Sequence, residues 1–131
     1  MTLDDLEQIQ MLDELINAKL AERQAVWEMV TKITPNSDDM PHASGVSDKV
    51  GNGVVKLVML AKELDQLVDE YVDLKRKVFA VLEKLPPEEY GVLHRRYVRY
   101  MRWGDIAADM GYSSMQIWRI KNRGLALLEK M

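Results

Sequence analysis

The apolar residues in the first quarter of the chain recur every three or four positions, which is the spacing of one face of a helix. They are Leu6, Ile9, Leu12, Ile16, Leu20, Trp27, Val30 and Ile33. Just before them, Thr2-Leu3-Asp4-Asp5 is typical of a capping box, in which Thr2 and Asp5 satisfy opposite backbone amides. The pattern predicts one long helix over residues 3–33.

The pattern is lost in residues 34–53, a stretch rich in Asn, Ser and Asp. Its helix breakers are Pro35, Pro41, Gly45, Gly51 and Gly53. This composition favours turns, and a loop of this length rarely keeps one conformation. We therefore predict a mobile loop over residues 34–53.

A heptad repeat follows over residues 54–85. One seam carries Val54, Ala61, Val68, Lys75 and Leu82, and the other carries Leu57, Leu64, Tyr71, Val78 and Leu85. A third row adds Leu60, Leu67, Leu74 and Val81. The apolar stripe is thus wider than the seam of a two-stranded coiled coil. We predict a long antiparallel, coiled-coil-like helical hairpin over residues 1–85 that forms a homodimer through its long helices. The alternative is a monomer whose hairpin folds back on the C-terminal part.

Pro86-Pro87 ends this helix and begins the next, since the residue before a proline avoids the α region. A break follows near residues 101–104, and then come a short helix at 105–110, a turn at 111–113 and a last helix at 114–130. The residues expected to form the shared core and turn are Ile106, Ala107, Met110, Gly111, Ile117 and Ile120. Ala107 allows a close crossing of the two helices, and Gly111 suits a turn that needs positive φ. The predicted fold is therefore all-α, with the hairpin followed by a helix-turn-helix domain over residues 86–131. The alternative is a helical pair that binds only protein.

Polar residues on the outward side of the last helix are the candidates for reading DNA bases. They are Gln116, Arg119 and Asn122, with Met115 as an apolar contact for a thymine methyl group. Arg, Asn and Gln form paired hydrogen bonds with guanine or adenine edges in the major groove. The sequence predicts double-stranded DNA as the partner.

Basic residues near these positions are candidates for phosphate contacts, together with Ser114 at the start of the last helix. They are Arg95, Arg96, Arg99, Arg102, Lys121 and Arg123. Residues 86–131 hold 8 basic and 5 acidic side chains, whereas residues 1–85 hold 10 basic and 16 acidic ones. The alternative for the arginines is ion pairing with acids of the long helices, namely Asp65, Asp69, Glu70 and Asp73.

The composition argues against several other classes of protein. The chain has no Cys, which excludes a disulfide framework, a thiolate metal site and a cysteine nucleophile. His42 and His94 lie in no catalytic or metal-binding motif, so we expect no enzyme activity, cofactor or metal. The longest apolar run is too short to span a bilayer, and the acidic start lacks a leader's basic segment. We expect a cytoplasmic protein without membrane contact.

The C-terminal residues Leu85-Pro86-Pro87-Glu88-Glu89, Val92-Leu93, Arg96-Tyr97, Asp105-Ile106-Ala107, Met110-Gly111-Tyr112-Ser113, Ile117, Ile120 and Leu125 form a recognisable pattern. This segment resembles region four of the bacterial sigma-seventy factors. The whole layout is similar to small phage-encoded regulators of the ArpU and RinA type. The resemblance implies a regulator of phage transcription in a bacterial host, with host RNA polymerase as a further partner. Ser114, Met115 and Gln116 stand where sigma factors usually present Arg-Glu-Arg, so their promoter preference is not implied.

A second phage protein class shares this general layout. Small terminase subunits, which act in DNA packaging, also join a DNA-binding helix-turn-helix to a helical oligomerising part. Such subunits form rings, whereas we expect a dimer here.

Overall fold

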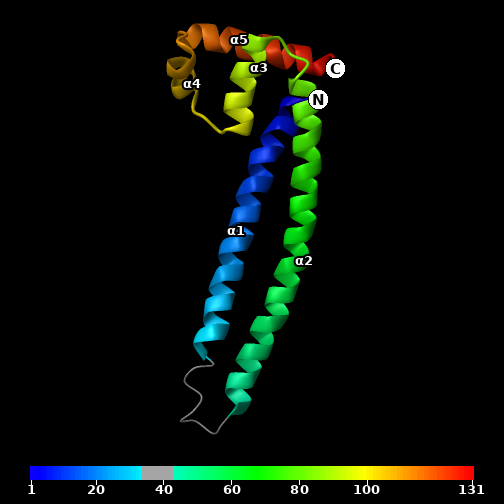
Figure 1. The fold of residues 1–131 in the computed structure, drawn as a ribbon, viewed down its shortest axis with the longest axis vertical. Helices are drawn as coiled ribbons and strands as arrows, with labels where there is room; N and C mark the ends of the chain where they lie inside the picture. Colours follow the sequence, from blue (N-terminus) through cyan, green and yellow to red (C-terminus); the bar gives the residue numbers. More distant parts are fainter. Residues whose placement is uncertain (34–42) are drawn as a thin grey trace. The chain divides into compact units, whose positions relative to one another are not determined.

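The computed structural model describes residues 1–33 and 43–131. Within these ranges every element is helical, which confirms the all-α prediction. The elements are α1 (Leu3–Ile33), α2 (Ala43–Leu82), α3 (Pro87–Leu93), the π-helical η2 (His94–Val98), α4 (Trp103–Met110) and α5 (Ser114–Glu129), and Figure 1 shows their order along the chain.

Helix α1 has the predicted bounds, and its first turn forms half of the predicted capping box. The Thr2 amide donates a hydrogen bond to Asp5 Oδ2 at 3.0 Å, as expected. The Thr2 hydroxyl, however, donates to the same carboxylate oxygen at 3.3 Å instead of accepting from the Asp5 amide. A hydroxyl rotates to suit its partner, and an ionised carboxylate is a strong acceptor.

Helix α2 begins at Ala43, so the prediction of a loop was wrong for residues 43–53. Residues 34–42 of that predicted loop lie outside the described residues. The long helix continues through Gly53 because Gly53 is buried against Val30 of α1. Close packing at a residue without a side chain offsets the low helix propensity of glycine.

At its other end α2 stops at Leu82, three residues before the predicted end. The chain tightens there, with the Lys84 amide bonding to Val81 O at 3.1 Å and the Leu85 amide to Leu82 O at 3.0 Å. Pro86 explains this early end, since Leu85 is kept out of the α region by the proline that follows it.

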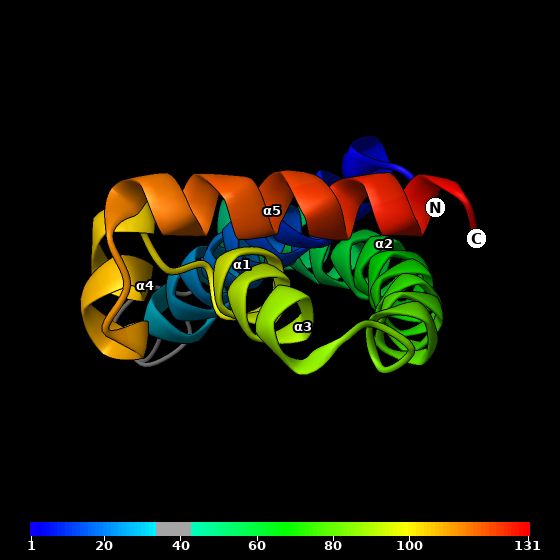
Figure 2. The ribbon, with the colours of Figure 1, turned by 90° about the horizontal axis from the view of Figure 1, so that it is seen from above.

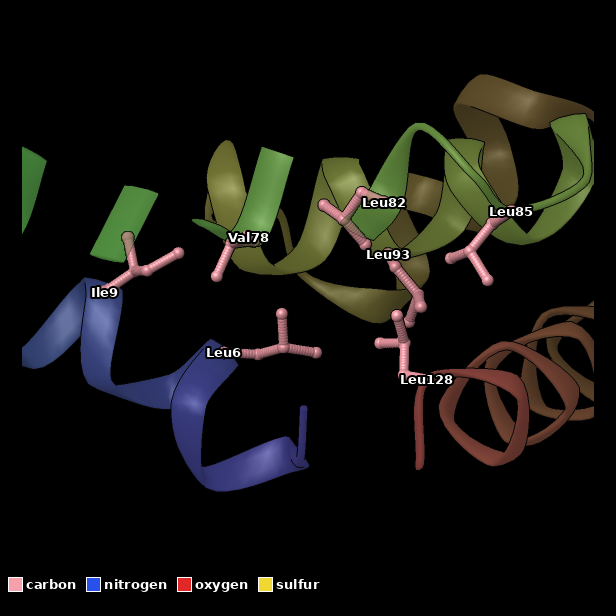
Figure 3. Packing of buried hydrophobic residues seen from close by; sticks show 7 residues of the cluster. All are labelled: Leu6, Ile9, Val78, Leu82, Leu85, Leu93 and Leu128. Carbon is pink, nitrogen blue, oxygen red and sulfur yellow. The ribbon is translucent and has the colours of Figure 1, made fainter. Parts of the chain in front are cut away.

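The described chain forms two compact units, and the long helices contribute to both. The first unit contains Met1–Asp13 and Glu70–Met131. Its main core brings together the start of α1, the end of α2, α3 and the end of α5. Figure 3 shows the buried residues of this core: Leu6, Ile9, Val78, Leu82, Leu85, Leu93 and Leu128.

The second unit, Glu14–Asp69, consists of the rest of α1 and α2, which run antiparallel. Two ion pairs fix their register, Lys19 Nζ to Glu63 Oε2 at 2.8 Å and Lys56 Nζ to Glu22 Oε1 at 3.3 Å. Its small core consists of Val26, Val30 and Leu60, with Val50 and Leu57 packed against it.

Two glycines in α2 give a matched test of this helix. A Cβ at Gly51 would meet nothing within 4 Å, whereas a Cβ at Gly53 would overlap the side chain of Val30. We expect Gly51→Ala to raise the free energy of unfolding by up to about 1 kcal/mol, because alanine favours a helix more than glycine does. We expect Gly53→Ala to lower it by about 1–3 kcal/mol through overpacking against a stiff β-branched residue. Urea unfolding followed by circular dichroism measures both, and equal effects would contradict a helix through residues 43–53.

Candidate nucleic-acid interface

A three-residue turn joins α4 to α5, as predicted. Gly111 adopts φ 71° and ψ 30°, the left-handed conformation expected for it. The Tyr112 amide bonds back to Ala107 O at 3.0 Å and closes the end of α4. Ser113 then begins α5, because its side chain accepts a hydrogen bond from the Gln116 amide at 3.2 Å. Local hydrogen bonds therefore fix both the end of α4 and the start of α5.

The inner side of α5 packs on α3 and α4. Figure 2 shows both of these helices along the same side of α5. The core under the turn consists of Val92, Ile106, Ala107, Ile117 and Ile120, with Met110 packed against it. The helical residues predicted to share a core are thus all found in it, and this packing fixes the rotation of α5 about its axis.

The predicted base-reading residues of α5 are all exposed. Met115 is 58% exposed, and the neighbouring Trp118 is 57% exposed. Arg119 and Asn122 are exposed, and within the described chain neither forms a hydrogen bond or an ion pair. These two side chains border an open hollow of about 530 Å³ that α5 shares with Tyr112 and the start of α3. They are placed to contact a ligand in that hollow.

Gln116 borders the same hollow but has a structural partner. Its Oε1 accepts a hydrogen bond from the Ser113 amide at 2.8 Å, which completes a capping box. A glutamine that forms paired hydrogen bonds with a base uses both its side-chain carbonyl oxygen and its side-chain NH2 group. Gln116 would therefore have to give up its bond to the Ser113 amide. We therefore assign Gln116 to the helix start and not to the base-reading group.

Arg123 is held by acids at the start of α3. Its Nη2 lies 3.5 Å from Glu88 Oε2 and its Nε lies 3.5 Å from the buried Glu89. Tyr112 donates a hydrogen bond to Glu88 at 3.1 Å, and this bond raises the pKa of the Tyr112 hydroxyl. The positive charge of Arg123 is thus offset, which makes this residue a weak candidate for phosphate binding.

Arg95 is also engaged, though not by the acids of the long helices considered above. Its Nε lies 2.7 Å from Asp109 Oδ2 in α4, and its Nη1 donates to Gly91 O at 3.1 Å. The hydrogen bond and charge of Arg95 lower the pKa of Asp109. Arg95 therefore connects α3 to α4, and its charge is offset locally.

The Trp103 ring contacts two of the predicted phosphate-binding cations, Arg96 and Lys121. The guanidinium carbon of Arg96 lies 4.8 Å from the Trp103 ring centre, and Lys121 Nζ lies 5.4 Å from it. Arg96 also donates to Met101 O at 2.9 Å. A small hollow of about 130 Å³ lies beside this ring and is bordered by Ser114, Trp118 and Lys121. Contact with one ring keeps both cations beside the start of α5.

Arg99 and Arg102 are the remaining predicted phosphate contacts. Both are exposed, and neither side chain forms a hydrogen bond or ion pair in the part of the chain that the structure describes. They flank Tyr100, which has the unusual positive φ of 58° for a residue other than glycine. The backbone turns sharply there, between η2 and α4.

His94 lies at the start of η2 in an aromatic stack. Its ring centre is 5.4 Å from that of Tyr90 and 6.3 Å from that of Phe79. Burial is the main cause that lowers the pKa of His94, and the positive charges of Arg99, Arg95 and Lys75 add to it. His94 is therefore a packed neutral residue. His42 lies outside the described residues.

The sequence did not indicate the part played by Trp103, Glu88 and Asp109 at this interface. Each acts through a partner that is distant in sequence, such as Asp109 with Arg95 or Glu88 with Arg123. No local motif signals such pairs. The capping role of Gln116, in contrast, was visible, because Ser113 and Gln116 have the spacing of a capping box.

Alanine variants of the capping box test whether Gln116 stabilises the start of α5. We expect Ser113→Ala to lower the free energy of unfolding by about 1 kcal/mol and Gln116→Ala by about 0.5–1 kcal/mol. Ser114→Ala is the matched control, because the Ser114 side chain forms no hydrogen bond among the described residues. Thermal unfolding measures all three. A Gln116→Ala protein as stable as the parent would return Gln116 to the base-reading candidates.

The lowered pKa of His94 predicts a loss of stability in acid. Below about pH 6.5 the unfolded chain takes up a proton at His94 before the folded chain does, so protonation favours unfolding. Above about pH 6.5 His94 is neutral in both states and does not affect stability. As the pH falls from there toward the lower pKa of the folded state, the free energy of unfolding decreases. His94→Phe keeps an aromatic ring but cannot titrate. Its thermal unfolding midpoint, measured by circular dichroism, should therefore fall less than the parent's when the pH is lowered from about 7.5 to about 5.5. Equal falls would contradict the lowered pKa.

Among residues 1–33 and 43–131, no group of three or more His, Asp or Glu residues could hold a metal ion. Nor does any helix in these ranges have the length and apolar character needed to cross a membrane. Comparisons with protein families, curated proteins and solved structures found no match to this chain. The geometry and charge of the residues around α5 are therefore the basis of a functional proposal.

Proposed function

We propose that this protein binds double-stranded DNA sequence-specifically, with α5 in the major groove. In this proposal α4 and α5 form a helix-turn-helix, carried by a helical hairpin of α1 and α2. The observation that carries it is the pair Arg119 and Asn122, which are exposed on α5 and have no partner in the described chain. The opposite side of the same helix is buried, so the two side chains are held outward.

The chemistry of this outer side suits base edges. Arg pairs with O6 and N7 of guanine, and Asn pairs with N6 and N7 of adenine. Met115 and Trp118 are apolar and exposed, which suits contact with the methyl group of thymine. We assign base reading to Arg119, Asn122 and Met115, with Gln116 as the residue that fixes the start of the helix.

We assign contacts with the DNA phosphate backbone to the cations that form no ion pair with an acid. Arg99 and Arg102 form no ion pair among the described residues, and Arg96 and Lys121 lie against Trp103. Phosphate contacts of this kind position a protein on DNA without reading its sequence. Ser114 at the start of α5 is a neutral candidate for the same task.

The biological role that we propose is regulation of phage or prophage transcription in the cytoplasm of a bacterial host. The resemblance of residues 85–125 to region four of sigma-seventy factors supports this role, as does the overall layout of long helices before that segment. A homodimer and a contact with host RNA polymerase are part of the proposal. A ring of eight or more copies in light scattering would favour a packaging subunit instead.

Two arginine variants test the proposed division of labour. We expect Arg119→Ala to lose about 1–3 kcal/mol of discrimination between its preferred site and other DNA. We expect Arg99→Ala to weaken binding to all sequences and to reduce the slope of log K against log salt by about 0.9. Sites selected from random DNA, followed by fluorescence anisotropy at several salt concentrations, measure both effects.

Lys130→Ala is the control for a general loss of charge, since Lys130 lies at the far end of α5. It should leave sequence preference unchanged. If Arg119→Ala and Arg99→Ala act equally on preferred and random DNA, the assignment of base reading to Arg119 is wrong. If the parent protein shows no salt-dependent DNA affinity, the proposed function is wrong.

A further inference from the structure

One long side of the second unit is apolar and uncovered. It includes Leu20 and Trp27 of α1, and Val54, Val58 and Val68 of α2, all exposed. Trp27 is 54% exposed and Val58 is 51% exposed. Single exposed apolar residues are ordinary on a protein surface, but a continuous patch of this kind marks an interaction site.

Two hollows of about 400 Å³ each lie along this side, and Arg23 borders both. The residues on α1 that line them follow a 4-3-4 spacing: Ile16, Leu20, Arg23 and Trp27. The corresponding row on α2 has the same spacing: Leu57, Ala61, Leu64 and Val68. This is the spacing of a coiled-coil seam, and two such seams side by side form half of a four-helix bundle. We name this surface, within residues 16–27 and 54–69, the seam face.

Charged residues are distributed unevenly along the seam face. Arg23 borders both hollows, whereas Asp65 and Asp69 border only the hollow that also contains Leu64 and Val68. Along α2 the acids follow Leu57 by about 12–18 Å at 1.5 Å per residue. Among the described residues, Arg23 forms no ion pair with either acid. The acids therefore lie toward one end of the seam face, and Arg23 lies nearer its middle.

We propose that the seam face binds the seam face of a second copy of this chain in the antiparallel direction. The ion pair of Lys19 with Glu63 places Leu20 and Ala61 at about the same level along the hairpin, near the middle of the face. A two-fold axis through that point brings Arg23 to the partner's Asp65 and the partner's Asp69, and the reverse contact forms by symmetry. A parallel copy instead places like charges at the same level. Ala61 at the axis leaves room for close helix packing.

This proposal rests on the homodimer of the proposed function and names its interface, but it is independent of DNA binding. The test is a charge exchange in the full-length protein. Arg23→Glu alone and the double variant Asp65→Lys with Asp69→Lys each place two repulsive contacts in the dimer. We expect each to raise the dimer dissociation constant about tenfold or more. A mixture of the two proteins restores both attractive contacts and should form a heterodimer.

Sedimentation equilibrium and native mass spectrometry give the masses, against 15.1 kDa for one chain. Met59→Glu is the matched control, because Met59 is 57% exposed but lies about 180° around α2 from Val68. It should leave the dimer intact, whereas Val68→Glu should dissociate it. Circular dichroism checks that every variant is folded.

A dimeric parent whose charge variants stay dimeric, or whose mixture stays monomeric, overturns the seam-face proposal and leaves DNA binding intact. A monomeric parent overturns the proposal together with the expected dimer, and a larger ring does so in favour of a packaging assembly. A seam-face dimer without DNA affinity overturns only the DNA-binding function.

Discussion

The close approach of α5 to α3 at Gly124 is the constraint on which the candidate interface depends. A Cβ at this position would lie 2.9 Å from Leu93 Cδ1 and 3.3 Å from Glu89 Cβ, so a larger residue would force the Leu93 side chain or the helices to shift. Because α5 lies close to the Leu93 and Glu89 side chains here, Ile117 and Leu128 can both reach buried positions along the same side of α5. The rotation of α5 follows from that contact. Arg119 is turned outward as a consequence of what is buried on the opposite side.

The same contact decides the electrostatics of the region. Glu89 is buried beneath α5, and a buried carboxylate is costly unless a partner compensates its charge. Arg123 supplies that charge together with a contact to the exposed Glu88. The flank of α5 toward the start of α3 is thereby close to neutral or acidic. The flank toward Trp103 holds Lys121 with no acid beside it among the interactions of the described chain. The distribution of charge around α5 therefore matters more for a polyanionic partner than the net charge of −3 for the whole chain.

Local sequence signals predicted the parts of the structure that local interactions determine. The bounds of α1, the left-handed Gly111 and the start of α5 all follow from residues within four positions of each other. The helix through residues 43–53 was not predictable in this way, because Gly53 is accommodated by Val30, which is distant in the sequence. Whether a given arginine forms an ion pair was equally unpredictable from local sequence. Arg95 and Arg99 look alike in the sequence, yet of the two only Arg95 forms an ion pair in the described structure.

The width of the apolar stripe on α2 is explained only in part by the fold of one chain. Within the second unit, Leu60 and Leu64 are buried, whereas Val54 and Val68 from the neighbouring seam remain exposed. Two antiparallel helices can bury only the rows that face each other, so a third apolar row stays in water in a single copy. Burying that row is favourable in proportion to its area, at about 25 cal/mol per Å². Apolar burial alone has no direction, however, and the opposed charges of Arg23 and Asp65 are what distinguish an antiparallel partner from a parallel one.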